Sequence, residues 1–202
     1  MAKGRPRSFD VDKALDVALR LFWQHGYEGT SIAQLASAMG VNVPSLYAAF
    51  GNKENLFAKV LHRYGELNGG MYHDSFKKKT SREVAEAILM GEVELVTRDE
   101  TPDGCLMILG ALLTSDESEN VRKMMSDMRA MAEGWIRDRF VSAKKEGDLP
   151  ADADPAALAC YIMALNSGIA VQAKSGVNRA QLKKMVRVAI QNWPMPPGQA
   201  RK

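Results

Sequence analysis

The sequence predicts an all-α protein, and three observations support that fold class. Apolar residues recur at helical spacing along almost the whole chain, strand-like alternation of Val, Ile and Thr is absent, and clusters of Gly, Pro and Asp separate the periodic segments. A chain of 202 residues with 46% hydrophobic content can form one or two domains with a sizeable core. We expect a three-helix N-terminal domain followed by a helical bundle.

The first predicted helix runs from about Asp10 to His25. Asp10 is a plausible N-terminal cap and Gly26 a natural stop. One apolar stripe, typical of a core helix, contains Val11, Ala14, Leu15, Ala18, Leu21 and Phe22.

Two short helices and a longer one follow. The first of them opens at Ser31, which with a Gln three residues later fits a capping box, and it breaks at Gly40. Asn42 can cap the next helix, where Pro44 in the first turn costs no hydrogen bond. Asn52 can cap the longer helix, whose apolar residues are Leu56, Phe57, Val60, Leu61 and Tyr64.

Beyond the pair Gly69-Gly70 and the basic run Lys77 to Lys79, apolar periodicity predicts four or five more helices. We expect them at about Ser81 to Val96, Gly104 to Leu113, Glu119 to Lys145, Pro155 to Lys174 and Arg179 to Trp193. Residues 194–202 begin with a Pro-rich stretch and are expected to form a disordered tail.

The spacing of Ala36, Gly40 and Leu46 fits a helix-turn-helix. Two short helices that cross steeply need a small residue at the crossing, a residue tolerant of positive φ in the turn, and an apolar anchor below the second helix. The three residues meet those needs in that order. Alone the triple is a weak signal, because Ala, Gly and Leu are common.

The surrounding motifs make the signal strong. Residues 30–36, 40–47 and 50–57, above all the string Leu-Tyr-x-x-Phe-x-x-Lys-x-x-Leu that starts at Leu46, closely resemble the DNA-binding domain of the tetracycline-repressor-like (TetR) family. The resemblance covers roughly residues 8 to 65 at motif level. It implies a helix-turn-helix domain in residues 1–52 with a basic N-terminal arm, and a helical effector-binding and dimerisation domain in residues 53–193.

The resemblance also implies a function. We expect a ligand-responsive repressor that binds a palindromic double-stranded DNA operator as a homodimer and releases it when a small effector binds. A cytoplasmic protein without a cofactor, structural metal, enzyme activity or membrane partner is expected, and the N-terminus has no signal-peptide segment. We find no apolar run approaching the roughly 18 uncharged residues of a membrane helix.

By the resemblance, the DNA contacts divide into two groups. Thr30, Tyr47 and Lys53 are expected to contact phosphates, although Tyr47 could be a core aromatic and Thr30 a plain helix cap. Base reading falls to Asn42, Val43, Pro44, Ser45, Ala48 and Ala49. That set holds no Arg for guanine and no Gln for adenine, so we expect thymine-methyl contacts and an A·T-leaning operator.

The arm offers Arg5 and Arg7 to an A·T minor groove, with an inert basic tail as the alternative. The family's dimer interface uses its last two helices. Here their apolar residues are Leu158, Tyr161, Ile162, Leu165, Ile169, Leu182, Met185, Val186, Ala189, Ile190 and Trp193.

The effector pocket is sought in a Met-rich set, since the flexible thioether suits irregular cavities and an apolar or aromatic ligand. The candidates are Tyr64, Met90, Met107, Met124, Met128, Met131 and Trp135, with ordinary core packing as the alternative for each.

Cys105, at the expected start of a helix, could instead serve a redox or electrophile sensor if the helix dipole lowers its pKa. A small buried residue is the other possibility. An enzyme is disfavoured because His25, His62 and His73 fit no metal spacing and no phosphate loop or nucleophile elbow occurs. A non-specific architectural DNA binder is disfavoured by the long helical region after Gly70.

Overall fold

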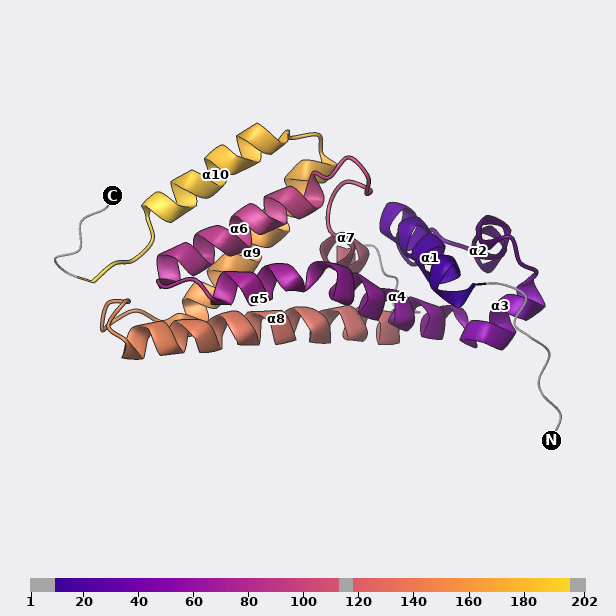
Figure 1. Ribbon diagram of the computed structural model, residues 1–202, viewed down its shortest axis with the longest axis horizontal. Helices are drawn as coiled ribbons and strands as arrows, with labels where there is room; N and C mark the ends of the chain where they lie inside the picture. The colour runs from indigo at the N-terminus through magenta and orange to yellow at the C-terminus, as the bar shows by residue number, and fades with distance from the viewer. Residues whose placement is uncertain (1–9, 113–117, 197–202) are drawn as a thin grey trace.

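The structure is a computed structural model that describes residues 10–112 and 118–196, and every regular element in those two ranges is a helix. The first five are α1 (Val11–His25), α2 (Ile32–Met39), α3 (Val43–Phe50), α4 (Lys53–Asn68) and α5 (Gly70–Phe76). The others are α6 (Ser81–Val96), α7 (Leu106–Leu112), α8 (Glu119–Lys145), α9 (Pro155–Lys174) and α10 (Arg179–Gln191). The molecule is elongated, with α1 to α3 at one end and the bundle at the other (Figure 1).

Most predicted helices are confirmed, and α5 is the one that the sequence analysis missed. The pair Gly69-Gly70 looked like a loop, but Gly69 has helical dihedral angles (φ −66°, ψ −21°) and joins α4 to α5 with almost no interruption. Helix α7 begins at Leu106 rather than Gly104, and α10 ends two residues before Trp193. Of the expected tail, residues 197–202 lie outside the described residues.

An aromatic cluster joins α1 to α4 and forms the core of the N-terminal domain. The ring of Phe22 meets that of Phe57 edge-on at 4.9 Å between centroids, and Tyr27 meets the same ring at 5.1 Å. Two turns further along α4, Tyr64 meets Trp23 edge-on at 5.0 Å. Edge-to-face pairs add about 0.5 to 1.5 kcal/mol each beyond the area they bury. Helix α4 is therefore fixed rigidly against α1.

Helices α2 and α3 form the predicted helix-turn-helix. Ala36 and Leu46 are buried, and Gly40 has left-handed dihedral angles (φ 67°, ψ 31°). The Gly40 N–H donates to the carbonyls of Ala36 and Ser37, which satisfies the end of α2. The triple inferred from sequence is confirmed at all three positions.

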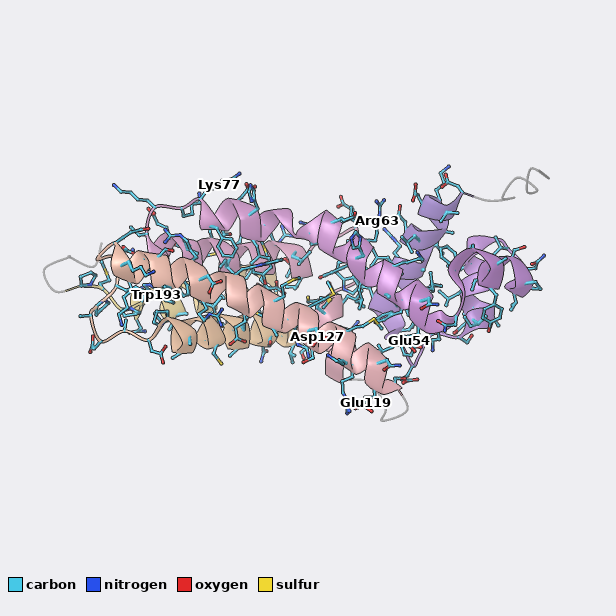
Figure 2. All side chains as sticks on the ribbon, turned by 90° about the horizontal axis from the view of Figure 1, so that it is seen from below. Glu54, Arg63, Lys77, Glu119, Asp127 and Trp193 are labelled. Carbon is cyan, nitrogen blue, oxygen red and sulfur yellow. The ribbon has the colours of Figure 1, made fainter. Side chains whose placement is uncertain are left out.

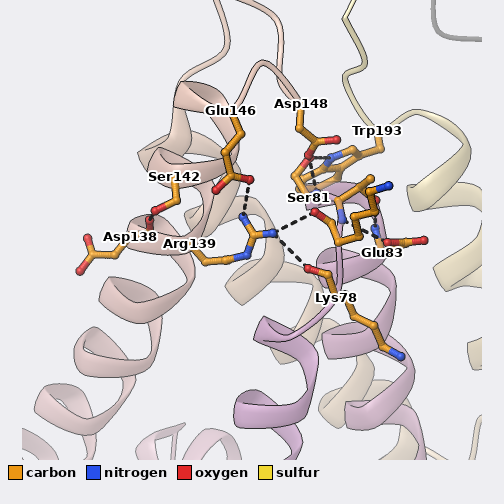
Figure 3. Close-up of polar contacts among 11 residues, drawn as sticks. Lys78, Ser81, Glu83, Asp138, Arg139, Ser142, Glu146, Asp148 and Trp193 are labelled. Carbon is orange, nitrogen blue, oxygen red and sulfur yellow. Dashed lines mark hydrogen bonds and ion pairs between the residues drawn. The ribbon is translucent and has the colours of Figure 1, made fainter.

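The long helix α8 spans the bundle from Glu119, beside the N-terminal domain, toward Trp193 at the far end (Figure 2). At that end, Arg139 Nη2 donates to the Lys78 carbonyl at 3.1 Å. Asp148 accepts from the Ser81 N–H at 2.5 Å, and Trp193 Nε1 donates to the Ser81 hydroxyl at 3.1 Å (Figure 3). These bonds tie α6, α8 and the segment after α10 together.

The expectation that no apolar run approaches the length of a membrane helix is wrong for helix α9. This helix carries no charged residue from Pro155 to Ala173, so by length and composition it could cross a membrane. In the structure α9 packs against α6, α7, α8 and α10. One face of α9 is therefore buried in the bundle, while its Tyr161 and Val171 are exposed.

One carboxylate lies inside the bundle. Glu92 on α6 is only 3% exposed, and burial raises its pKa from 4.5 to about 7, while a hydrogen bond with Cys105 acts in the opposite direction. Because burial penalises the ionised form, the folded chain binds the proton of Glu92 more tightly than the unfolded chain does. Stability should therefore fall as the pH rises from about 4.5 to about 7.

Replacing Gly40 tests the turn. A Cβ at this position would meet no atom within 4 Å, so Gly40→Ala adds only left-handed backbone strain. We expect a loss of about 1 kcal/mol in the free energy of unfolding, and a smaller loss for Gly40→Asn because Asn tolerates this conformation. Urea unfolding at fixed protein concentration measures both. Equal stability of Gly40→Ala and the parent would contradict the turn.

Replacing Glu92 tests the buried charge. At about 1.4 kcal/mol per pH unit, the raised pKa corresponds to roughly 3 kcal/mol. We expect Glu92→Gln to stabilise the protein relative to the parent by that much more at pH ~8 than at pH ~4.5. Urea unfolding at the two pH values measures the difference. Glu66→Gln, at an exposed side chain, is the control and should show no such change.

Candidate DNA interface and ligand pocket

Helix α3 presents one face to solvent. Asn42, Pro44 and Ala48 are exposed, and Tyr47 is 46% exposed. The buried residues Leu46 and Phe50 hold the opposite face against the domain core, while Val43 and Ser45 are half-buried. Tyr47 is therefore not a core aromatic, which was the alternative that the sequence allowed. Its exposed ring lies where a phosphate contact is possible.

The polar capacity of this face is small. The side chain of Asn42 caps α3, because its Oδ1 accepts from the Ser45 N–H at 2.8 Å. Within the predicted base-reading set, the Asn42 amide hydrogens and the Ser45 hydroxyl can bond to base edges. The other candidates, Val43, Pro44 and Ala48, offer only apolar contact, which in the major groove suits the thymine methyl group.

The structure contradicts the predicted phosphate contact of Thr30. Its side chain is 1% exposed and its hydroxyl donates to the Gly26 carbonyl at 2.8 Å. It cannot reach a phosphate oxygen, and the cap of α2 is Ser31. Thr30 instead closes the turn between α1 and α2.

Lys53 begins α4 with its Nζ 4.2 Å from the centre of the Tyr27 ring. Partial burial lowers its pKa, and nearby Glu28 acts in the opposite direction. The ring holds the ammonium group in place beside the N-terminus of α4, a natural position for a phosphate. The two arm residues of the prediction, Arg5 and Arg7, lie outside the described residues.

A second site is a cavity of about 430 Å³ between α4, α5, α6, α8 and α9. Five of the candidates proposed from sequence line it, namely Tyr64, Met107, Met128, Met131 and Trp135. Met90 and Met124 are partly buried against the core and are not among its lining residues. The rest of the apolar wall includes Met71, Leu95, Ile108 and Met163.

The sequence analysis missed the polar residues of this cavity. Glu92, Asn166, Tyr72 and Arg129 all line it. A signal was available, because Glu92 stands among buried apolar neighbours on α6 and Asn166 lies between the buried Ile162 and Ile169 on α9. A polar residue on a buried stripe needs a hydrogen-bond partner, so its presence there indicates a polar site.

Cys105 also lines the cavity, and its chemistry is the reverse of the sensor hypothesis. Burial, and next the negative charge of Glu92, raises the pKa of Cys105 to about 12. Its Sγ lies 3.2 Å from the Tyr64 hydroxyl. The thiol precedes a short helix as expected, but burial outweighs the helix dipole, and the low-pKa thiol proposed from the sequence is wrong.

The cavity wall touches the DNA-binding end directly. Tyr64 packs on Trp23 of α1, and Trp23 Nε1 donates to the Gly104 carbonyl at 2.9 Å, next to Cys105. A second link joins Arg20 of α1 to the carbonyl of Glu100 at 2.6 Å. A change in the cavity wall can therefore reach α1 through direct contacts.

The expected dimer residues divide by burial. Seven are buried within the single chain, namely Ile162, Ile169, Leu182, Val186, Ala189, Ile190 and Trp193. They form the core between α6, α9 and α10 because α6 covers the apolar faces of both helices. Tyr161 is 43% exposed, and Leu158, Leu165 and Met185 are half-buried. The open surface of α9 and α10 also contains Ala164, Gly168, Val171 and Val188, which the prediction did not name.

Two family models match this chain. The model described as bacterial regulatory proteins of the tetR family matches residues 14–60, which span α1 to α3 and the start of α4. The model for the tetracyclin repressor-like C-terminal domain matches residues 77–189, from just before α6 into α10.

Individual relatives agree with these models. The HTH-type transcriptional repressor ComR of Escherichia coli is 34% identical over 195 residues, which cover 96% of this chain and 93% of ComR. The E. coli repressor BdcR is 48% identical over 61 residues, 30% of this chain and 31% of BdcR. A cysteine mutant of the TetR family regulator CifR, solved in complex with a 26-base-pair operator DNA, is 41% identical with a TM-score of 0.90, covering 95% of this chain and 100% of that one. This chain therefore belongs to the tetR family of bacterial regulatory proteins, whose helix-turn-helix its α2 and α3 form.

Proposed function

We propose that the protein binds a palindromic operator as a homodimer and releases it when a small effector fills the cavity. The observation that carries the proposal is the shared wall: Tyr64 lines the cavity and packs on Trp23 of the DNA-binding domain. We assign DNA binding to residues 1–52 and effector binding and dimerisation to residues 53–193, with α4 in contact with both.

Operator reading rests on α3. Its exposed Pro44 and Ala48, with Val43 beside them, suit thymine methyl groups, while Asn42 or Ser45 supplies the polar contact. Tyr47 and Lys53 fix the helix on the phosphates, and Arg5 and Arg7 are assigned to the adjacent minor groove. Base specificity would then come from shape and methyl contacts more than from bidentate hydrogen bonds.

The dimer is assigned to the exposed face of α9 and α10. Tyr161, Ala164, Gly168 and Val171 lie along one side of α9, and Val188 of α10 is 59% exposed. Small residues let a second pair of helices approach closely, and the larger ones supply apolar area to bury. A two-fold axis through this face places two copies of α3 on two half-sites of one palindrome.

Release is assigned to the contacts between the cavity and α1. An effector that pushes on Tyr64 or on the Gly104-Cys105 segment changes the position of Trp23, which bonds to that segment. Because α1 carries the helix-turn-helix, such a shift changes the separation of the two recognition helices in a dimer. An effector acts in this way only if it binds the released form more tightly than the DNA-bound form.

Selection of operator sites from random duplex DNA by the full-length protein tests the DNA-reading proposal. We expect palindromic half-sites whose positions under α3 are rich in A·T pairs, because the reading face contacts thymine methyl groups. Sequencing of the bound fraction measures this composition. Half-sites rich in G·C at those positions, or a specific-to-nonspecific affinity ratio near one, would overturn it.

A charge placed on the α9 surface tests the dimer. Ala164→Arg puts an unpaired cation into the proposed interface, and we expect monomers by sedimentation velocity and a loss of operator affinity of about a hundredfold or more. Ala130→Arg, at an exposed position of α8, is the matched control and should remain dimeric. A fully dimeric Ala164→Arg would place the interface elsewhere.

A further inference from the structure

One part of the cavity contains hydrogen-bond acceptors without partners. Glu92 of α6 and Asn166 of α9 are 3% and 1% exposed, and both line the cavity. Among the described residues, Glu92 Oε1 and Asn166 Oδ1 receive no hydrogen bond. The Asn166 amide nitrogen donates to the hydroxyl of Tyr72 on α5 at 3.4 Å. Three helices thus bring three polar groups to the same cavity.

Glu92 also lacks a cation within the described part of the chain. Its pKa is raised by burial, and no positive charge acts against that rise. The cavity is also lined by Arg129, whose guanidinium donates to the Met107 carbonyl, and by His62, which pairs with the exposed Glu66. The buried Oε1 atom of Glu92 and Oδ1 atom of Asn166, which have no partner among the described residues, each cost free energy that a bound ligand can recover.

Glu92, Asn166 and Tyr72 restrict the polar group that a ligand of this cavity can carry. When Glu92 is ionised, both unpartnered atoms are acceptors, so a ligand that satisfies them donates at least two hydrogen bonds. A hydroxyl group has one hydrogen to donate and a carboxylate has none, whereas a primary ammonium group has three and neutralises Glu92. The Tyr72 oxygen can take the third.

The remaining wall specifies the body of the ligand. Leu95, Ile108, Met128 and Met163 line the cavity, and Trp135 is an aromatic member of its wall. A volume of about 430 Å³ suits a small organic molecule. Such a wall gains from burying an apolar or aromatic group and offers little to a sugar or a phosphate.

We propose that the effector is an amphipathic primary amine, with its ammonium group between Glu92, Asn166 and Tyr72 and its apolar body against the methionine-rich wall. The proposal rests on the proposed function in taking this cavity as the effector site. It specifies the effector class, which the family does not fix.

Calorimetric titration of the full-length dimer, without DNA, tests the ligand class. The probes are arylalkylamines from benzylamine to 4-phenylbutylamine, each with the alcohol and the carboxylate of the same carbon skeleton. At pH ~8, where Glu92 is mostly ionised and the amines are protonated, we expect the best amine to bind at least about tenfold more tightly than its alcohol. The matched carboxylates should show no binding.

Variants locate the ammonium group. Glu92→Gln keeps the shape and removes the charge, so amine affinity should fall by about tenfold or more while alcohol affinity changes little. Asp127→Asn removes a charge from an exposed residue of α8 that does not line the cavity, and it should leave amine binding unchanged. Thermal unfolding confirms that each variant is folded. Asn166→Leu removes the second acceptor, so it is the second test and should also weaken binding of the amine.

Three results would overturn the proposal: equal binding of amine and alcohol, tightest binding of the carboxylate, or no binding of any amine at roughly millimolar concentration. Each would mean that Glu92 and Asn166 do not bind an ammonium group. Operator binding is measured separately by fluorescence anisotropy. A protein that binds its operator but no amine refutes only the effector class, whereas a protein that binds amines but no palindromic DNA refutes the proposed function.

Discussion

The structure depends on helix α4, which packs side chains into the N-terminal domain and into the wall of the cavity. The N-terminal half of α4 packs Leu56, Phe57 and Val60 into the domain that holds the helix-turn-helix, and Tyr64 lies in the wall of the cavity. Because protein interiors are close-packed, α4 cannot move in one core without repacking the other. The aromatic contacts with Phe22 and Trp23 make this coupling stiff. A ligand site and a DNA site are thereby joined through a single rigid element.

Much of this fold is predictable from local sequence because the helices carry explicit end signals. Asp10, Ser31, Asn42 and Asn52 all cap helices in the structure through their side chains. Local sequence does not predict α5, because two adjacent glycines disfavour a helix, whereas packing of α5 on α6 and α4 holds Gly69 in a helical conformation. Tertiary contacts override local propensity in such cases.

The functional surfaces were predictable to different degrees. Helical period predicts which residues of α3 face away from the core: Asn42, Pro44 and Ala48 are exposed, whereas Val43, Ser45 and Ala49 are half-buried. The role of Thr30 was not predicted correctly, because its hydroxyl turns inward to a carbonyl four residues earlier, a local bond that periodicity does not reveal. The cavity needed three-dimensional information, since Glu92 and Asn166 come together only when α6 packs on α9. Similarly, the pKa of Cys105 depends on burial that no residue spacing encodes.

The buried carboxylate of Glu92 affects both the proposed choice of effector and the stability of the fold. In the empty cavity the ionised carboxylate destabilises the fold. Glu92→Gln, which removes the charge, is therefore expected to raise the free energy of unfolding at pH ~8. A biosensor engineered from this protein for neutral effectors could carry Glu92→Gln, and the added stability would let it tolerate further substitutions. One engineered toward tighter binding of cations would have to find that stability elsewhere, for example in better packing around α5.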